Sequence, residues 1–506
     1  MVTVPEVHQE PAQGSGSSGS SEAGRTYQVV IIGSGFGGQI AAMSLLKRGN
    51  KDFCILERRD FMGGTWCQNT YPGAAVDVPS PLYSIARERF AWSQMFADQA
   101  ELERYTNGVI DKYNLRGFTR TRTNVERLEW VGDRWIITIT DGAPIEARFV
   151  INATGPLSTP VVPDVPGRDT FGGDSFHTNN WDHTVDYRNK RVAVVGSGAS
   201  AAQVIPAIQP DVSELHVFQR TPHWVMPRHD HTFTPWQRFA LRSSIAQRAL
   251  RTWIYWSLES RVIAFKYSHG IMKRMAQAPA LQHLEAQIED PDLRSDLTPE
   301  YTIGCKRIIL SSTLYPALAA DNTTLHTAAD GIDHIDESGI VTESGRHLDV
   351  DVIVWSTGYD ATDGMITYPV VGRDGHKLAE EWSEFPRAYL GTSIPYFPNL
   401  FIVTGPNTGI GHTSALFVIE AQMEYIMRAL DHVRYNNATA IEVLPDAERA
   451  YTDMIHREME QTVWKSGGCN SWYQSKSGHV IAMFPGFSFS FRLMARFFRA
   501  SHHHLS

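Results

Sequence analysis

Two glycine-rich segments of the chain have the spacing that binds the phosphates of a dinucleotide. The first reads GSGFGG, with Gly33, Gly35 and Gly38, and the second reads GSGASA over residues 196–201. In the first segment, one glycine permits a tight turn, the next lets the backbone approach a pyrophosphate, and the third allows close packing of the following helix. A chain with two such segments is expected to bind two dinucleotides and to move electrons between them.

Each glycine-rich segment lies between two strands, and the three together form one nucleotide-binding unit. The side chain that follows the second strand differs between the two units. Glu57 suits a carboxylate that accepts hydrogen bonds from ribose hydroxyls. The second unit instead continues Gln219, Arg220, Thr221, and a guanidinium there can bind a 2′-phosphate. The alternative is that Arg220 is an ordinary solvated arginine. The pattern predicts FAD in the first site and NADPH in the second, because a flavin accepts a hydride and passes the electrons on.

The elements around these segments predict the fold. Residues 29–32 form a continuous apolar run, typical of a parallel strand buried on both faces, and residues 53–56 form a second strand. The second unit repeats the plan, with strands at 192–195 and 215–218 and a helix that ends near residue 208. We therefore expect an α/β protein with two Rossmann-like dinucleotide-binding domains, one for FAD and one for NADPH.

Composition excludes several other classes of protein. The net charge of −9 argues against a nucleic-acid partner, which would need a basic face. Four cysteines without a CxxC pair indicate neither a disulfide scaffold nor a disulfide reductase, and they favour a reducing compartment. The sequence has no basic start with an apolar core and no run of about 18 apolar residues. We expect a cytoplasmic enzyme without a transmembrane segment, in which O₂ accepts the electrons.

The segment between the two glycine loops identifies a family. Residues 171–182 read FGGDSFHTNNWD and match FxGxxxHxxxW(P/D), so the chain resembles the type I Baeyer–Villiger monooxygenases, of the class B flavoprotein monooxygenase family. GGTW over residues 63–66, YPGAAVDVPS over 71–80 and PNLFIVTGPNTG over 398–409 support the resemblance. It implies that a ketone, O₂ and NADPH react through a C4a-peroxyflavin to give an ester or lactone.

The resemblance also assigns individual residues. It makes Arg307 the catalytic cation and Asp77 the carboxylate that orients it, because a fixed guanidinium stabilises negative charge in a dry site. It gives His177 a role in coupling the domains rather than that of a general base. No metal is expected, since His229 and His231 stand alone. The predicted FAD-binding residues are Gly33, Gly35, Gly38, Glu57, Gly64, Thr65, Trp66, Asp77, Tyr83 and Val125; those for NADPH are Gly196, Ser197, Gly198, Ser200, Ala201, Gln203, Arg220, Thr221, Lys306 and Trp472.

The predicted domain order is discontinuous. We expect a disordered N-terminal arm over residues 1–25, an FAD-binding domain over 26–157 and 389–506, and an NADPH-binding domain over 158–388. The NADPH-binding domain carries a helical insert over residues 231–302.

In this insert Ile245, Ala249, Trp253 and Trp256 recur at helical spacing. The insert is also basic, through Arg238, Arg242, Arg248, Arg251, Arg261, Lys266, Lys273 and Arg274. A solvated helix face is favoured over peripheral membrane contact as the explanation. The enzyme is expected to be a monomer or a dimer.

Two other functions remain open at this point. One is a flavin-containing monooxygenase that makes N- or S-oxides, although such enzymes usually carry Tyr or Phe where Trp181 stands. The other is a non-catalytic flavin-binding protein, against which Arg307 and Asp77 argue. Residues 471–478 keep the Ser-Trp-Tyr of the family's mobile loop but depart from its continuation, so the closure of this loop and the ring size of the ketone are not predicted.

Overall fold

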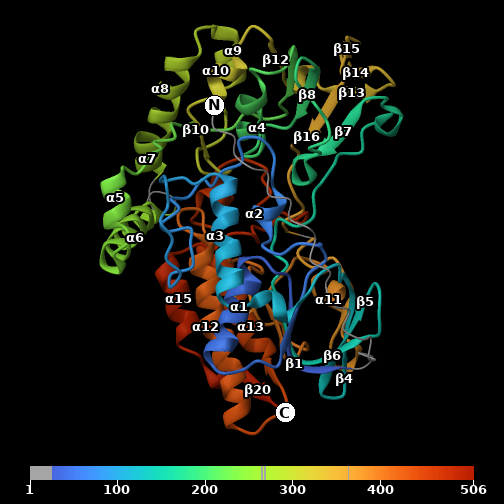
Figure 1. Cartoon of the computed structure of the whole chain (residues 1–506), viewed down its shortest axis with the longest axis vertical. Coiled ribbons are helices and arrows are strands. Elements are labelled where there is room, and N and C mark those ends of the chain that lie inside the picture. The colour runs from blue at the N-terminus through green and yellow to red at the C-terminus, as the bar shows by residue number, and fades with distance from the viewer. Residues whose placement is uncertain (1–24, 264–265, 267–268, 363) are drawn as a thin grey trace, which may run out of the picture.

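The protein is built around two β-sheets, each carrying one of the glycine loops. The computed structural model describes residues 25–263, 266, 269–362 and 364–506. The arm predicted over residues 1–25 lies outside the described residues, apart from Arg25. Figure 1 shows the two sheets one above the other, with the longest helices packed beside the lower one.

The first sheet holds the loop of residues 33–38. In order across it, the strands are β17 (Val370–Val371), β4 (Val125–Val131), β5 (Arg134–Ile139), β6 (Ile145–Asn152), β1 (Thr26–Ile32), β2 (Phe53–Leu56) and β3 (Thr119–Arg120), and β18 (Leu400–Ile402) also pairs with β6. β1 runs parallel to β2 and β6, which places Ile32, Leu56 and Asn152 at one edge of the sheet. Ligands of such sheets bind outside the carboxyl ends of the strands, so this edge is the place for a dinucleotide.

Strand β1 is buried on both faces, as its apolar run predicted. Val29 and Ile31 pack into a core with the helices α1 (Phe36–Lys47) and α12 (Ala415–Tyr435). Val30 and Ile32 point the other way, into a second core that includes Trp135. The alternation of side chains along a strand explains why four consecutive apolar residues are needed here.

The second sheet repeats this arrangement around the loop of residues 196–201. Its strands, in order, are β12 (Thr323–His326), β9 (Glu214–Phe218), β8 (Arg191–Val195), β16 (Val352–Trp355) and β7 (Asp174–His177), all parallel. The loop follows β8, and helix α4 (Ala201–Ile208) begins at the end of the loop. The predicted α/β fold with two dinucleotide-type units is thus confirmed.

Smaller sheets and the remaining helices complete the molecule. A three-stranded sheet joins β13 (Ile332–Ile335), β14 (Gly339–Thr342) and β15 (His347–Asp349), and β19 (Ile441–Val443) pairs with β20 (His503–Leu505). The other helices are α2 (Thr65–Gln68), α3 (Gln99–Lys112), α10 (Leu314–Leu318), α11 (Leu378–Glu381), α13 (Pro445–Met459), α14 (Val463–Ser466) and α15 (Ser488–Arg496).

A run of helices interrupts the second unit. They are α5 (Pro235–Ala240), α6 (Ser244–Glu259), α7 (His269–Met272), a π-helix (Lys273–Gln277), α8 (Ala278–Gln287) and α9 (Pro291–Asp296). Strands β10 (Val225–Met226) and β11 (Ile309–Leu310) pair with each other and bring the two ends of this run together. Helices α5 and α6 project at the edge of the molecule in Figure 1.

The chain returns to the first sheet earlier than residue 389. Strand β17 (Val370–Val371) pairs in parallel with Leu128 and Glu129 of β4, so these residues belong to the first sheet and not to the second. The sequence offered only a two-residue apolar pair at this place, which is too short to indicate a strand. The other domain boundaries stay predictions.

Candidate active site

The first glycine loop requires glycine at two of its positions. Gly33 has a φ of +99°, and a Cβ there would lie 2.6 Å from the carbonyl oxygen of Ala153. A Cβ on Gly38 would lie 2.0 Å from the carbonyl oxygen of Gly33. Both positions therefore exclude a side chain, and the backbone turns tightly into α1.

Glu57 is fixed beside this loop at the end of β2. Its carboxylate accepts hydrogen bonds from the Ser34 N–H (3.0 Å), the Ser34 hydroxyl (2.6 Å) and the Arg59 N–H (3.0 Å). The residue is only 7% exposed. A buried carboxylate at the carboxyl end of a strand, next to a glycine turn, is suited to bind the ribose hydroxyls of a dinucleotide.

The second loop leaves open space for a phosphate. Gly196 has a φ of +120° and lies against the carbonyl oxygen of Ser356, whereas nothing lies within 4 Å of where a Cβ on Gly198 would stand. The Ser197 hydroxyl donates to the carbonyl oxygen of Thr221 (3.0 Å), which joins the loop to the segment after β9. A loop with open space, followed by the start of a helix, is the arrangement that binds a pyrophosphate.

Arg220, which precedes Thr221, lies near a second cation, Lys306. Burial, and then the nearby charge of Arg220, lower the pKa of Lys306, so the two side chains lie within electrostatic reach. Burial and the charge of Lys306 lower the pKa of His223 to about 4. Two like charges held together in this way are repelled by one another and are stabilised when an anion such as a 2′-phosphate binds.

The predicted pair of Arg307 and Asp77 is present. The Arg307 Nε–H donates to Asp77 Oδ2 at 2.7 Å, and its Nη2–H donates to Oδ1 at 2.6 Å. Arg307 precedes β11 and Asp77 lies between α2 and α3, and their side chains are 40% and 28% exposed. The carboxylate raises the pKa of Arg307 above its already high ordinary value. A permanently charged guanidinium is thereby held in one orientation.

Two tyrosines lie within electrostatic reach of this pair. Burial raises the pKa of Tyr473 to about 12, with the Arg307 charge acting against it. Burial also raises the pKa of Tyr83, whose hydroxyl accepts a hydrogen bond from the Trp66 indole (3.2 Å). Sequence reasoning named Tyr83 and Trp66 but missed Tyr473, although Tyr473 stands next to Trp472 in the Ser-Trp-Tyr segment.

The other predicted cofactor-binding side chains lie in several different parts of the structure. Gln203 on α4 donates to the carbonyl oxygen of Ala75 (2.9 Å), and so joins the second loop to the segment that carries Asp77. Thr65 is exposed at the start of α2, and Val125 is buried as the first residue of β4. Trp472 is 42% exposed and packs on Tyr473, with ring centroids 4.5 Å apart. Its predicted contact with NADPH stays a prediction.

Comparison with known proteins decides the family. A family model described as pyridine nucleotide-disulphide oxidoreductase matches residues 30–267. The chain is 41% identical to a Baeyer–Villiger monooxygenase of Pseudomonas aeruginosa, over 96% of this chain and 92% of that relative. It is 42% identical to another from Streptomyces coelicolor, over 93% of this chain and 91% of that relative. The chain belongs to the Baeyer–Villiger monooxygenase family.

A solved structure agrees with this membership. Cyclohexanone monooxygenase from Rhodococcus sp. Phi1, bound to NADP⁺, matches with a TM-score of 0.85 and 28% identity, over 96% of this chain and 100% of that chain. The chain is therefore an FAD- and NADPH-dependent Baeyer–Villiger monooxygenase, and the predicted family, enzyme class and cofactors are confirmed. The described glycine turns, Glu57 and the Lys306–Arg220 pair fit these two cofactors.

The Baeyer–Villiger fingerprint lies at the contact between the two units. His177 Nδ1 accepts a hydrogen bond from the Asn179 N–H (3.0 Å), and Asn179 Nδ2 donates to Asn69 Oδ1 (3.2 Å) after α2. The Gln68 amide donates to the carbonyl oxygen of Asn179 (2.5 Å). Trp181 is buried in the core of the second unit. These contacts join the nucleotide units, as a coupling segment requires, but the coupling itself stays a prediction.

A disulfide joins the Arg307 segment to the Trp472 segment. Cys305 pairs with Cys469, which is 164 positions away in the sequence. The lack of a CxxC pair indicated neither a disulfide scaffold nor a disulfide reductase, and it gave no sign of this single bond, because two cysteines so far apart have no local spacing that would indicate one. Cys305 is fully buried, and the Thr302 N–H donates to the carbonyl oxygen of Gly467 (3.1 Å) beside it. The segment that carries Arg307 is thus covalently attached to the loop that carries Tyr473.

Two further observations bear on metals and membranes. Among the described residues, no three His, Cys, Asp or Glu side chains come together as a metal site would require. No helix in the described ranges has both the length and the apolar character needed to cross a membrane.

Proposed function

We propose that Arg307, oriented by Asp77, is the catalytic cation with which this monooxygenase converts a ketone to an ester or lactone. The observation that supports this most is the two-point hydrogen bond between them, at 2.7 and 2.6 Å. It fixes the plane of the guanidinium and leaves one edge of Arg307 free of Asp77. That side chain is 40% exposed, so part of the guanidinium is accessible from outside the pair.

The charge of Arg307 suits the reaction. Attack on a ketone carbonyl places negative charge on oxygen, and a preorganised cation stabilises that charge without having to reorient. Because Asp77 raises the pKa of Arg307, the guanidinium stays protonated throughout the working pH range. When bound and reduced by NADPH, FAD would activate O₂, so that one oxygen atom is inserted next to the carbonyl and the other is released as water.

The cofactor residues have separate roles in this proposal. The first loop, Glu57 and the segment with Trp66 and Tyr83 hold FAD, whereas the second loop, Arg220, Thr221 and Lys306 hold NADPH. The segment that carries Asp77 also contacts the second unit, because the carbonyl oxygen of Ala75 accepts a hydrogen bond from Gln203 of α4. Trp472 lies beside the nicotinamide in this proposal, because it packs on Tyr473, which is within electrostatic reach of Arg307.

The substrate and setting complete the proposal. A small-molecule ketone and O₂ are the substrates, and a structural relative named for cyclohexanone supports this class. The enzyme acts in the cytoplasm, as a monomer or a dimer. Its FAD-binding domain is discontinuous, with the NADPH-binding domain inserted into it.

Substitution of Arg307 tests the proposal. Arg307→Ala is expected to lower ester formation by about a hundred- to a thousandfold, because one preorganised charge at the reacting oxygen is lost. NADPH should still reduce the flavin, which absorbance of the bound FAD reports. Ester yield by mass spectrometry gives the product, and unchanged yield would overturn the role of Arg307.

A matched variant separates chemistry from folding. Arg191 forms a similar two-point pair with Asp351, at 3.2 and 2.8 Å, and has a comparable side-chain exposure of 35%. It lies at the start of β8, away from the candidate site. Arg191→Ala should leave ester formation per folded enzyme unchanged, whereas an equal loss in both variants would indicate a structural effect.

A further inference from the structure

Helices α5 and α6 present large apolar side chains to solvent. Trp236 is 81% exposed, Ile245 80%, Trp253 67% and Trp256 55%. The helical spacing of residues 245, 249, 253 and 256 predicted an apolar stripe, yet this stripe is not the buried face of α6. The buried face carries Ile254 and Leu258, which pack against Leu82. Helix α6 therefore has two apolar faces, and the protein covers only one of them.

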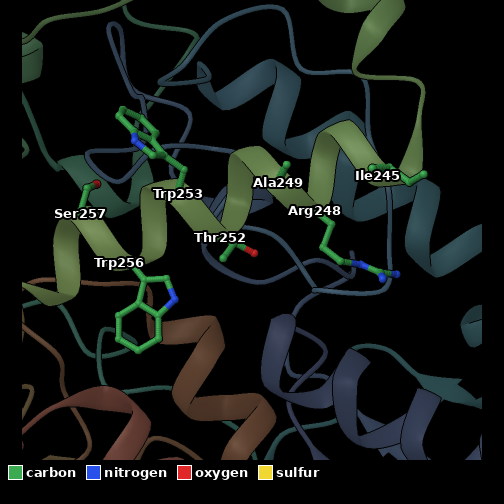
Figure 2. A pocket seen from close by; sticks show the side chains of 7 residues that line it. All are labelled: Ile245, Arg248, Ala249, Thr252, Trp253, Trp256 and Ser257. Carbon is green, nitrogen blue, oxygen red and sulfur yellow. The ribbon is translucent and has the colours of Figure 1, made fainter.

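The uncovered face is a continuous surface. Only residues 241–243 separate α5 from α6, and Figure 1 shows both helices at the same edge of the molecule. A shallow groove of about 680 Å³ runs along α6, lined by Ile245, Arg248, Trp253 and Trp256 among others. Figure 2 shows this face of α6, with Trp253 projecting toward one margin of it and Trp256 and Arg248 toward the other. Apolar patches of this kind mark sites of interaction.

The charge of this surface is opposite to that of the whole chain. Residues 235–258 contain no Asp or Glu, although the chain has a net charge of −9. Arg238, Arg242 and Arg248 are exposed and form no ion pair with any residue that the structure describes. Arg251 differs, because it donates to the carbonyl oxygens of Pro81, Leu82 and Ser84 and holds α6 on the molecule.

We propose that the α5–α6 face is a docking surface for an anionic lipid bilayer. Exposed tryptophans prefer the headgroup level, where the ring is apolar and the indole N–H stays hydrated. Arginines beside them are attracted to anionic headgroups by about 1 kcal/mol each. A helix with these two kinds of residue on one face lies in the plane of the bilayer interface.

A second copy of the chain fits this surface less well. A twofold interface places the same patch against itself. The patch with Arg238, Arg242 and Arg248 would then face the same positively charged patch of the other copy, without a carboxylate between residues 235 and 258 to offset the repulsion. The combination of charge and tryptophan therefore favours a lipid surface over self-association.

Co-sedimentation with vesicles tests the surface. The holoenzyme is mixed with vesicles of phosphatidylcholine alone or of phosphatidylcholine with phosphatidylglycerol. It should bind the anionic vesicles, bind the neutral ones far less, and be released by added salt. Arg238→Gln/Arg242→Gln/Arg248→Gln should weaken binding by about a hundredfold, at about fivefold per charge. Trp236→Ser/Trp253→Ser should weaken it by about tenfold or more.

Matched controls make each outcome decisive. Arg122→Gln/Arg188→Gln/Arg449→Gln removes three exposed arginines elsewhere and should leave vesicle binding unchanged. NADPH oxidation should be the same in all variants, which shows that they fold. Binding to neither vesicle, or equal binding to both, would overturn the proposal. So would a dimer of the wild type, measured by sedimentation velocity, that the tryptophan variant abolishes. Ester formation is independent of these results.

Discussion

Arg220 follows β9 and lies within electrostatic reach of Lys306, and we propose that these two cations bind the 2′-phosphate of NADPH. A charge-assisted hydrogen bond to a phosphate contributes about 1.5–3 kcal/mol. Arg220→Gln is therefore expected to lower kcat/KM for NADPH by about ten- to a hundredfold and to leave that for NADH unchanged. Steady-state kinetics with both coenzymes measure this. Equal losses for the two would contradict the assignment, and Arg188→Gln, an exposed arginine paired with Asp186, serves as a control.

The lowered pKa of Lys306 predicts that the affinity for NADPH depends on pH, whereas the affinity for NADH does not. Burial and the charge of Arg220 lower the pKa of Lys306 in the free enzyme, and a bound 2′-phosphate would raise it again. NADPH affinity should thus be greatest while Lys306 is protonated and should fall as the pH rises through the lowered pKa.

The matching measurement is KM against pH for both coenzymes. KM for NADPH should rise at alkaline pH, whereas KM for NADH, which has no 2′-phosphate, should stay flat. Lys306→Arg should remove the rise, because a guanidinium stays protonated there. Parallel profiles for NADPH and NADH would refute the role of Lys306.

At the scale of elements, the strand–loop–helix units could be predicted from the sequence, and long-range pairs could not. β2 has the predicted bounds Phe53–Leu56, and α4 ends at the predicted Ile208. These signals are local, since an apolar run, a glycine turn and a helix follow one another directly. The Cys305–Cys469 bond and the nearness of Tyr473 to Arg307 depend on how distant segments fold together, which no short pattern encodes.

The disulfide carries a prediction about stability. A bond that closes a loop as long as residues 305–469 typically stabilises a protein by about 2–4 kcal/mol. Cys305→Ser/Cys469→Ser should therefore inactivate at a lower temperature, measured as residual activity after heating. Dithiothreitol should reproduce this loss in the wild type and have no effect on the double variant. Identical heat inactivation of the two proteins, with and without the reductant, would contradict the prediction.

At the scale of the whole molecule, the ion pair of Arg307 and Asp77 links the two nucleotide-binding units. Arg307 comes from the end of the helical run that interrupts the second unit, and Asp77 comes from the first. The sequence predicted this pair by family resemblance, because the residues are far apart in the chain. It did not predict the uncovered face of α6, since spacing alone does not tell which apolar stripe of a helix is buried.

Product identification tests the central claim most directly. The purified holoenzyme, given NADPH and ¹⁸O₂, is offered a panel of ketones and a matched panel of thioethers, and the products are identified by mass spectrometry. Ketone oxygenation predicts esters or lactones that carry one ¹⁸O atom next to the original carbonyl. Sulfoxides from the thioethers, without any ester from the ketones, would contradict it.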